Sequence, residues 1–281
     1  MNQAEILIIG VIYNTYPETL RYLESFGTTE NGQLLLILVD NSVGVAPREF
    51  TEKIGGYPFL HYLKTGRNAG YFGGASVGLQ HYLEEHSGYP RWILVTNVDI
   101  VFTPGFFSRL LNIADKSNLG MVAPSIISKR WHSDYNPKIL ERYSRKKLLF
   151  YQLLYSSFLF HNLFLVAAYL KKWIKGKKTP AEKAGNDNQS GRKIYAPHGS
   201  CLVFHRNYFL RGGNLDLPNF LFGEEVLVAE NVLNSGLDVI YHPKLVVYDY
   251  EHASIGFFVT PAINKYYAES NRAILENYYK Q

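Results

Sequence analysis

Four acidic residues of this 281-residue chain stand where a carboxylate could do chemistry. Asp99, with Asn97, ends the apolar run RWILVTNVD, and an acidic side chain there can bind a divalent cation that bridges two phosphates. Asp40 ends the run LLLILVD and could accept hydrogen bonds from a nucleotide base or ribose, although a strand-capping turn explains it equally well. Glu224 and Glu225 stand together at an expected helix start, where they either complement the helix dipole or include a general base.

Two further features bear on these acids. If the aromatic residues Phe220 and Phe222 cover the Glu224–Glu225 pair, burial and mutual repulsion raise the pKa of one carboxyl towards neutrality. His252 follows another apolar run, and a lone histidine is usually structural, but beside a metal it is a ligand.

The segment GRNAGYFGGASVGLQ, residues 66–80, brings Gly70, Gly73, Gly74 and Gly78 to the start of a helix. Missing side chains let the backbone approach a diphosphate, and a helix N-terminus favours anions. The pattern is neither a phosphate loop ending in Gly-Lys-Ser/Thr nor a dinucleotide fingerprint, which would follow the first strand. A plain loop with close helix packing explains it equally well.

These residues depend on a regular alternation of elements. Buried apolar strands that alternate with helices predict an α/β fold around a mostly parallel sheet with right-handed crossovers. Ligands bind beyond the carboxyl ends of such strands, so the polar residues at those ends are expected to share one edge. We expect strands at 5–13, 33–40, 59–64, 91–98, 120–127, 194–204 and within 237–249, and helices at 17–26, 47–54, 73–85, 104–116, 223–235 and 262–278.

The net charge of +5 is unevenly distributed. Residues 138–193 hold 13 Lys/Arg and 3 Asp/Glu, whereas the rest of the chain has an excess of acids, so a uniformly basic nucleic-acid-binding protein is excluded. A content of 47% apolar residues provides for a sizeable core. The single cysteine, Cys201, excludes an internal disulfide and a cysteine-based zinc site, which favours a reducing compartment. The first residues do not resemble a signal peptide.

Taken in order, these motifs resemble the family-2 inverting glycosyltransferases of the GT-A fold, and most closely the bacterial rhamnosyltransferase-like branch that builds O-antigen and capsule polysaccharides. The resemblance covers about 5–130 and 194–255 and rests on the Tyr-Asn after the first strand, VDNS, NAGYFGGASVG, TNVDI, GSCLVFHR, FGEE and the final histidine. It implies a Rossmann-like sheet and metal-dependent transfer of a sugar from dTDP-rhamnose or a UDP-hexose to a hydroxyl of a lipid-linked glycan.

The resemblance also assigns roles to individual residues. It implies that Glu225 deprotonates the acceptor hydroxyl with support from Glu224, and that Asp99 and His252 hold Mg²⁺ or Mn²⁺ on the diphosphate. The residues that it places around the nucleotide-sugar donor are Tyr13, Asn14, Asp40, Asn68, Gly70, Gly73, Gly74 and Asn97.

Several positions depart from the family pattern. Asn97 replaces the first acid of the family's Asp-x-Asp, and Glu225 replaces the aspartate of its Glu-Asp pair. Leu227 and Asn231 stand where the family often has Asp and Arg. Two alternatives therefore stay open: a transferase that acts on a soluble acceptor, and a catalytically silent membrane-associated binding protein on the same fold.

The chain is expected to divide into a donor-binding half (1–137), a basic apolar helical insertion with a mobile loop (138–193), and an acceptor-side half with the base (194–281). The apolar stretch 148–170 is long enough to cross a bilayer, but a single crossing would place Asp99 and Glu225 on opposite sides. The same stretch could instead pack inside the protein or form a homodimer contact.

A broken polar stripe along 157–175 favours a helix or helix pair that lies on the membrane surface with its apolar face in the interface. The flanking cations would then meet anionic headgroups. The resemblance implies a polyprenyl-diphosphate-linked acceptor at the cytoplasmic face of the bacterial inner membrane, where the protein would be peripheral. The cations expected at the membrane are Arg142, Arg145, Lys146, Lys147, Lys171, Lys172 and Lys175.

Overall fold

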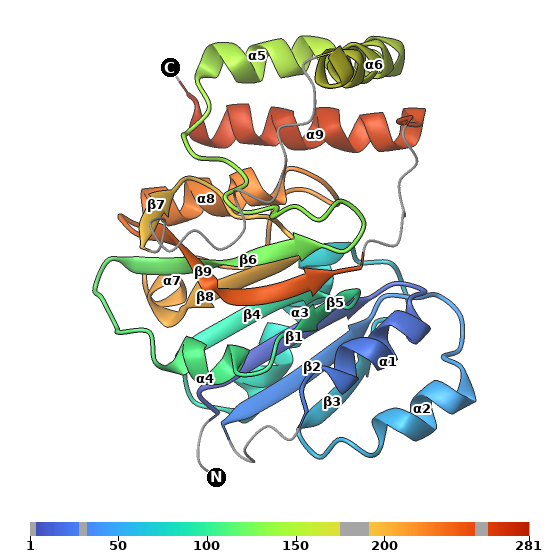
Figure 1. The fold of residues 1–281 in the computed structure, drawn as a ribbon, viewed down its shortest axis with the longest axis vertical. Coiled ribbons are helices and arrows are strands. Elements are labelled where there is room, and N and C mark those ends of the chain that lie inside the picture. Colours follow the sequence, from blue (N-terminus) through green and yellow to red (C-terminus); the bar gives the residue numbers. More distant parts are fainter. Residues whose placement is uncertain (1–3, 28–32, 175–190, 251–257, 281) are drawn as a thin grey trace.

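The computed structural model describes residues 4–27, 33–174, 191–250 and 258–280. Their centre is a nine-stranded sheet in the order β3-β2-β1-β4-β8-β6-β9-β5, with β7 paired to β9 (Figure 1). The strands are β1 (Ile6–Ile12), β2 (Leu34–Asp40), β3 (Leu60–Lys64), β4 (Trp92–Asn97), β5 (Ile100–Phe102), β6 (Leu119–Ser128), β7 (Arg192–Ile194), β8 (Cys201–His205) and β9 (Asp238–Asp249).

Six strands run in one direction. Strands β1, β2, β3 and β4 are mutually parallel, and β6 and β9 share their direction because β8 is antiparallel to both β4 and β6. The short strands β5, β7 and β8 run the other way. The expected mostly parallel sheet is thus confirmed. Strand β1 lies between β2 and β4, so the strand order reverses there, and open α/β sheets bind ligands beyond the carboxyl ends at such a point.

Apolar side chains cover both faces of the sheet. Alternate residues of β1 enter different clusters: Ile6 and Ile8 join one, while Leu7 and Ile9 join the other. This follows from the two-residue period of a strand and explains why β1 reads as an unbroken apolar run. The helices are α1 (Tyr16–Glu24), α2 (Arg48–Ile54), α3 (Tyr71–Glu85), α4 (Phe106–Leu111), α5 (Arg145–Leu154), α6 (Phe158–Ile174), α7 (Arg206–Leu210), α8 (Glu224–Asn234) and α9 (Pro261–Tyr278).

Beyond α8, the helices form a separate layer. Helix α9 lies between α8 and the α5–α6 pair, which is the outermost part of the molecule at that end (Figure 1). A third apolar cluster, which includes Leu148, Leu227 and Ile274, joins α5, α8 and α9. The insertion therefore rests on α9, and the strands on either side of it in the chain belong to one continuous sheet.

Most expected elements agree with the structure, and two differ. The strand expected at 194–204 is two strands, β7 and β8, and the backbone between them leaves the sheet at Ala196, which pairs instead with Ile139. Pro197, which has no N–H to offer a ladder, follows directly. The helix expected at 104–116 is only α4, and the short strand β5 precedes it.

The apolar stretch 148–170 is divided between α5 and α6. Within the described ranges, no individual helix combines the length and the apolar character of a membrane span. Helix α5 and the segment Phe158–Ala168 meet that criterion only as a pair, and the pair is bent by 114°.

Candidate active site

The carboxyl end of β4 is tied to its neighbours by backbone hydrogen bonds. The amide of Asn97 donates to the carbonyl of Ser200 (3.0 Å), which joins β4 to the loop before β8. Two residues later, the carbonyl of Asp99 accepts a bond from the amide of Tyr250 (3.1 Å), just after β9. Asn97 and Asp99 thus stand where three strands of the sheet meet their loops.

The two adjacent glutamates lie over the same loop. A Cβ placed on Gly199 would lie 3.4 Å from Oε1 of Glu225 and 3.5 Å from Oε1 of Glu224. Gly223, with a left-handed φ of 74°, precedes them as the N-cap of α8. Both carboxylates are therefore held beside the backbone that enters β8.

Glu224 has an unusual environment for an acid. Its Oε2 is buried and has no hydrogen-bond partner among the described residues. Burial and the charge of Glu225 raise the pKa of Glu224 to about 8. The expectation that one acid of this pair has a raised pKa is thus confirmed, and it is the first of the two.

Tyr71, the first residue of α3, connects the glutamates to Asp99. Its hydroxyl donates to the carbonyl of Gly199 (2.8 Å). Burial raises the pKa of Tyr71 well above its usual value, and the nearby charges of Glu224 and Asp99 add to the rise. Gly199 lies beside the glutamates, and the carbonyl of the next residue, Ser200, accepts a bond from the amide of Asn97, so the structure brings the end of β4 and the start of α8 together at this loop.

The glycine-rich segment lets the loop before α8 approach the backbone of Gly70 closely. Gly70 has a φ of +77°, and a Cβ there would lie only 2.6 Å from the carbonyl oxygen of Phe220. The loop before α8 is therefore packed directly on the start of α3. The turn is held by the Asn68 side chain, which accepts a bond from the amide of Gly70 (3.0 Å), and by Asn41, which donates to its carbonyl (2.7 Å).

The later glycines of this segment pack α3 on the sheet. A Cβ on Gly74 would lie 2.9 Å from Nδ2 of Asn41, and one on Gly78 would lie 2.6 Å from the Cγ2 of Ile9. Gly73 meets only Ala69 of the preceding turn, at 3.2 Å. The packing interpretation is therefore confirmed for Gly70, Gly74 and Gly78, whereas contact of this segment with a diphosphate stays a prediction.

Asp40 is fully buried at the end of β2. Its Oδ2 accepts bonds from Tyr62 (2.6 Å), Lys64 (2.9 Å) and Tyr16 (3.0 Å), and its Oδ1 accepts one from the amide of Ser42 (2.9 Å). Burial alone would raise the pKa of Asp40, but these hydrogen bonds hold it below its usual value. The carboxylate thus orients residues around the edge, and a direct contact with a nucleoside stays a prediction.

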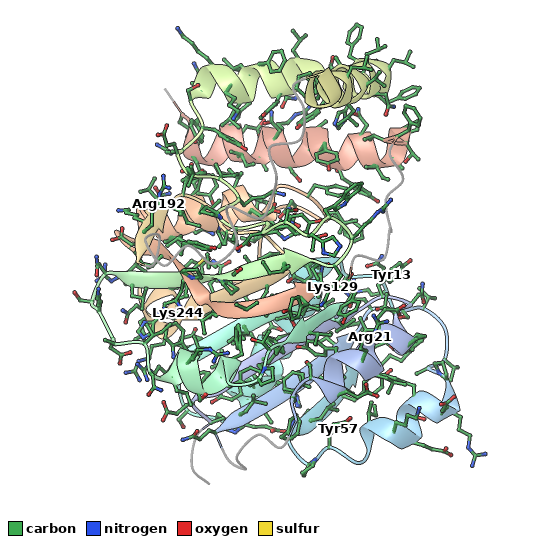
Figure 2. The ribbon with its side chains drawn as sticks, in the orientation of Figure 1. Tyr13, Arg21, Tyr57, Lys129, Arg192 and Lys244 are labelled. Carbon is green, nitrogen blue, oxygen red and sulfur yellow. The ribbon has the colours of Figure 1, made fainter. Side chains whose placement is uncertain are left out.

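Tyr13 and Asn14 follow β1 at the same edge. Tyr13 is 49% exposed (Figure 2). Asn14 has a left-handed φ of 57°, and its amide donates to the hydroxyl oxygen of Ser42 (2.8 Å). Both residues are accessible, and contact with a nucleoside stays a prediction for them also.

His198 is a neighbour of the site that the sequence patterns did not single out. Its amide donates to the Asn136 side chain (2.8 Å), its Nδ1 lies 3.0 Å from Oγ of Ser200, and its ring stacks on Tyr135 at 4.8 Å. Burial and the nearby positive charge of Lys138 lower the pKa of His198 to about 3, so its ring is neutral. Its place in PHGS, directly before an apolar strand, was the available signal.

Lys138 also acts on Glu224. Its positive charge works against the rise in the pKa of that acid, so it lies within electrostatic reach of the pair. The side chain is exposed, and the sequence patterns did not mark it either.

The basic residues expected at a membrane fall into three groups. Arg145 and Lys146 are exposed, whereas the ammonium of Lys147 lies 3.7 Å from the ring centroid of Tyr143. Lys171 and Lys172 lie within α6. Lys175, the expected mobile loop and the candidate metal ligand His252 lie outside the described residues.

Arg142 has a partner inside the protein. Its guanidinium donates two hydrogen bonds to the fully buried carboxylate of Glu230, from Nε (2.8 Å) and Nη2 (2.7 Å), and it lies 4.4 Å from the ring centroid of Tyr279. A buried carboxylate needs such a partner. Arg142 therefore neutralises a buried acid, although its side chain is 43% exposed, and a contact of Arg142 with lipid stays a prediction.

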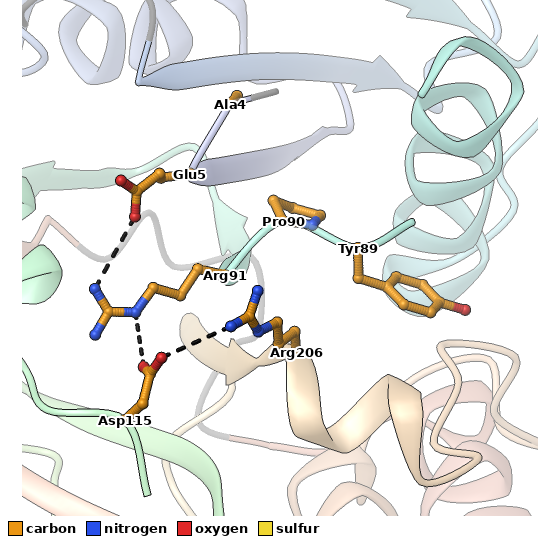
Figure 3. Close-up of a pocket in the computed structure, with 7 residues that line it drawn as sticks. All are labelled: Ala4, Glu5, Tyr89, Pro90, Arg91, Asp115 and Arg206. Atoms are coloured by element: carbon orange, nitrogen blue, oxygen red, sulfur yellow. Dashed lines mark hydrogen bonds and ion pairs between the residues drawn. The ribbon is translucent and has the colours of Figure 1, made fainter. Parts of the chain in front are cut away.

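A hollow at the opposite edge of the sheet is separate from this site. Arg91 precedes β4 and Arg206 follows β8, and both pair with Asp115, at 2.8 and 3.7 Å (Figure 3). Glu5 lies 4.0 Å from Arg91. The two arginines already have carboxylate partners, so this hollow has no obvious charge to offer a ligand.

Comparisons with known proteins bear on both sequence and fold. The family model "Glycosyl transferase family 2" matches residues 7–209. A curated relative, the N-acetylglucosaminyl-diphospho-decaprenol L-rhamnosyltransferase of Mycobacterium tuberculosis, is 24% identical over 257 residues, which cover 89% of this chain and 77% of the relative. The low-salt glycan biosynthesis hexosyltransferase Agl10 of Haloferax volcanii is 22% identical over 70% of this chain and 52% of its own length.

Two solved structures have a similar fold. The structure of GalNAc-T7 with UDP, GalNAc and Mn²⁺ superposes with a TM-score of 0.60 at 14% identity. The superposition covers 96% of this chain but only 48% of the length of GalNAc-T7. The mannosyltransferase PcManGT from Pyrobaculum calidifontis with GDP-Man and Mn²⁺ gives 0.52 at 13% identity, covering 98% of this chain and 74% of that one. The expected GT-A architecture is thereby confirmed.

Proposed function

Since this chain belongs to glycosyl transferase family 2, we propose that it transfers a sugar from a nucleotide-diphosphate sugar to a hydroxyl of a lipid-linked glycan, with inversion at the anomeric carbon. One observation carries the proposal. The Tyr71 hydroxyl at the start of α3 donates to the carbonyl of Gly199, which lies beside Glu224 and Glu225. The carbonyl of the next residue, Ser200, accepts a bond from the amide of Asn97 at the end of β4. A candidate base and a candidate diphosphate-binding edge thus meet in one place.

On the acceptor side, Glu225 is the proposed base. Direct displacement at an anomeric carbon needs a group that removes the proton of the attacking hydroxyl. With a pKa of about 8, Glu224 is mostly protonated at neutral pH, so it adds little negative charge beside Glu225. Its protonated carboxyl can then donate a hydrogen bond to an acceptor oxygen.

On the donor side, the start of α3 and the end of β4 are proposed to hold the diphosphate. Asn97 and Asp99 offer amide and carboxylate oxygens, the donors that Mg²⁺ and Mn²⁺ prefer, so the residues present fit such an ion. When bound, the cation would offset the charge that develops on the leaving diphosphate. Gly70 begins this edge of α3 with a φ of +77°, which glycine adopts without strain, while its Cα side is packed against the Phe220 carbonyl.

The identity of the substrates is also a proposal. The mycobacterial relative is named for an acceptor on a decaprenyl diphosphate and for rhamnose, which supports dTDP-rhamnose and a polyprenyl-diphosphate acceptor. The UDP and GDP-Man of the solved structures keep a UDP-hexose as an alternative donor. The role would be synthesis of a bacterial surface polysaccharide, such as an O-antigen or capsule, by a peripheral protein at the cytoplasmic face of the inner membrane.

A transfer assay tests this proposal. Purified protein would be incubated with dTDP-rhamnose or UDP-hexoses, Mn²⁺ and a polyprenyl-diphosphate-linked N-acetylglucosamine, with a soluble glycan as the second acceptor. We expect transfer to the lipid-linked acceptor and an inverted anomeric configuration in the product. Transfer to the soluble glycan alone would overturn the acceptor assignment. Stabilisation by a donor with no turnover would indicate a silent binding protein, and a Tm that no donor changes would count against the whole proposal.

A further inference from the structure

The outward face of the α5–α6 pair is strongly apolar. Side chains that are between 38% and 67% exposed cover it, although they are large and hydrophobic. This pair forms the outermost layer of the molecule, beyond α9 (Figure 1). The residues of this surface, called here the apolar face, are Leu149, Phe150, Leu153, Phe158, Leu159, Phe160, Leu163, Phe164 and Leu170.

The inward side of α6 is polar. His161 is 4% exposed and its Nδ1 lies 2.9 Å from Oδ1 of Asn264 on α9. Asn162 exchanges two hydrogen bonds with the backbone of Val259, at 2.9 and 2.8 Å. The polar side chains that a soluble amphipathic helix would turn to water are here directed into the protein.

Helix α5 follows the same arrangement. Asn271 of α9 donates to Gln152 (2.9 Å) and to the carbonyl of Leu148 (3.0 Å). On its inner side α5 also buries Leu148 and Leu154, so the pair is held by polar and apolar contacts together. Its exposed side still carries large apolar side chains that belong to none of the core clusters of the described residues. A contiguous exposed apolar surface of this kind marks an interaction site.

Charge identifies the occupant. Arg145 and Lys146 are exposed beside the apolar face, and the sequence has no Asp or Glu between residues 142 and 181. A second copy of the chain seated on this face would oppose the same positive charges. An anionic lipid surface complements both the apolar side chains and the cations.

We propose that the apolar face inserts into the interfacial layer of an anionic bilayer, while the sheet stays in water. The bend of 114° between the helices suits two segments that lie in the interface. This inference deepens the proposed function and rests on it only for the identity of a lipid-borne acceptor.

The orientation places the acceptor side of the site towards the inserted helices. The residues directly before Glu224 and Glu225 pack on α9, because a Cβ on Gly223 would lie 3.1 Å from the Cβ of Ser270 and the ring of Phe222 stacks on Tyr267 at 4.3 Å. Glu225 therefore faces the helical layer, whereas Asp99 and Gly70 belong to the sheet side. A lipid-linked acceptor would approach the base from the membrane, and a soluble donor would approach from the sheet edge.

Vesicle flotation tests this inference. The variant Leu153→Ser/Leu163→Ser replaces two side chains that are 67% and 66% exposed, so folding should be unaffected. We expect its partition onto phosphatidylglycerol vesicles to fall by about tenfold or more. The matched control Val45→Ser/Leu210→Ser changes two exposed apolar residues outside this face, 95% and 66% exposed, and should bind like the wild type.

The remaining arms of the experiment separate a lipid surface from a second copy of the chain. Arg145→Gln/Lys146→Gln should weaken binding to phosphatidylglycerol by about tenfold and change binding to phosphatidylcholine little. Equal vesicle binding by all variants would overturn the inference. So would a wild-type dimer that becomes monomeric in Leu153→Ser/Leu163→Ser while vesicle binding stays the same. Vesicle binding without any sugar transfer would count against the proposed function alone.

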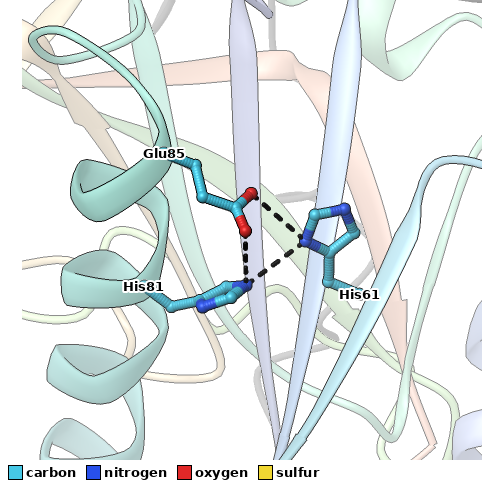
Figure 4. Close-up of side chains that lie close together, drawn as sticks. All are labelled: His61, His81 and Glu85. Carbon is cyan, nitrogen blue, oxygen red and sulfur yellow. Dashed lines mark hydrogen bonds and ion pairs between the residues drawn. The ribbon is translucent and has the colours of Figure 1, made fainter.

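A different observation supports a second site, between β3 and the C-terminal end of α3. His61 of the edge strand β3 faces His81 and Glu85, which are one turn apart on α3 (Figure 4). Nδ1 of His61 lies 3.3 Å from Nε2 of His81, and each of these atoms lies 3.9 Å from a different oxygen of Glu85. In a tetrahedral zinc site with bonds of 2.0–2.2 Å, ligand atoms are about 3.3–3.6 Å apart.

We infer that His61, His81 and Glu85 bind a borderline transition-metal ion such as Zn²⁺, with water as the remaining ligand. Two imidazoles and one carboxylate suit Zn²⁺ rather than the hard cations expected at Asp99. The ion would join the edge strand β3 to α3, the helix that begins at the glycine-rich segment. Bound to the folded state alone, it would stabilise the protein.

Calorimetry and thermal shift with ZnCl₂ test this second inference. The titration would use an Asp99→Ala background, so that the proposed donor-side metal site does not contribute. We expect one Zn²⁺ per chain and a raised Tm, with affinity reduced at least tenfold by His81→Ala and little changed by the control His132→Asn, which alters an exposed histidine elsewhere. The same affinity and Tm shift in His81→Ala would overturn it.

Discussion

The hydroxyl of Tyr71 donates a 2.8 Å hydrogen bond to the carbonyl of Gly199, from a position 128 residues earlier in the chain. The bond joins the start of α3 to the loop beside which Glu224 and Glu225 lie. It therefore links the glycine-rich segment to the acidic pair, and the proposed chemistry depends on their relative positions.

Replacing the proposed base should stop transfer and leave the fold intact. We expect Glu225→Gln to lower kcat by about 10²–10⁴-fold, the usual contribution of a positioned base, with little change in Tm. Single-turnover transfer with saturating donor measures the effect. Full activity in this variant would remove Glu225 from the mechanism.

The raised pKa of Glu224 predicts a pH dependence of stability. An acid with a pKa of about 8 in the folded state and 4.5 as its ordinary value binds more protons when folded, so the free energy of unfolding falls as pH rises from about 4.5 to 8. Glu224→Gln cannot ionise and should escape this loss. Its Tm relative to the wild type should therefore rise between pH 5 and pH 9, and a constant difference would contradict the assignment.

Gly70→Ala should disturb the contact between α3 and the loop before α8. The new Cβ would meet the Phe220 carbonyl at 2.6 Å in a backbone of positive φ, so we expect a loss of stability of about 1–3 kcal/mol and weaker donor binding. Gly66→Ala is the matched control, because Gly66 also has a positive φ (+70°) but no atom within 4 Å of the added Cβ. Equal losses in both variants, measured by urea unfolding and donor titration, would mean that the Phe220 contact is unimportant.

Asp40→Asn should destabilise the fold. The substitution removes the charge that Lys64 faces and disrupts a carboxylate that accepts bonds from Tyr16, Tyr62 and Ser42. Breaking one side of a buried charged pair costs about 3–5 kcal/mol, and about half of that is expected here because Lys64 is partly exposed. Urea unfolding measures the loss, and an unchanged midpoint would contradict a structural role.

Removing metal should weaken donor binding in a way that depends on Asp99. We expect EDTA, or Asp99→Ala with Mn²⁺ present, to lower the affinity for dTDP-rhamnose or a UDP-hexose by about tenfold or more. Glu225→Gln is the control, because it lies on the acceptor side and should keep Mn²⁺-dependent donor binding. Calorimetry with and without Mn²⁺ measures the affinity for the donor. Donor binding that does not depend on the metal would refute the proposed role of Asp99.

Much of the fold was predictable because its signals are local. The apolar runs of β1, β2 and β4 are each buried on both faces, so their composition alone marks them as central strands. Polar residues directly after those runs, such as Asp40 and Asp99, necessarily fall at the carboxyl edge of a parallel sheet. The order of the motifs likewise indicated the family.

The tertiary structure decided what depends on contacts between distant segments. Tyr71 lies within the glycine-rich segment and His198 within PHGS. Neither pattern shows that these residues contact the Gly199 carbonyl and Asn136, which come from distant parts of the chain. Composition could not show that Arg142 pairs with the buried Glu230, 88 residues further along the chain.

The orientation of the α5–α6 pair shows the same limit. A helical pattern separates a polar face from an apolar face, but it does not say which of them meets the protein. Here Asn264 and Asn271 of α9 bind the polar side of the pair, and the apolar side is left outside. The sequence by itself determined the elements and the edge where the acids gather, whereas packing across long sequence separations decided which side chains meet there and which surface faces outwards.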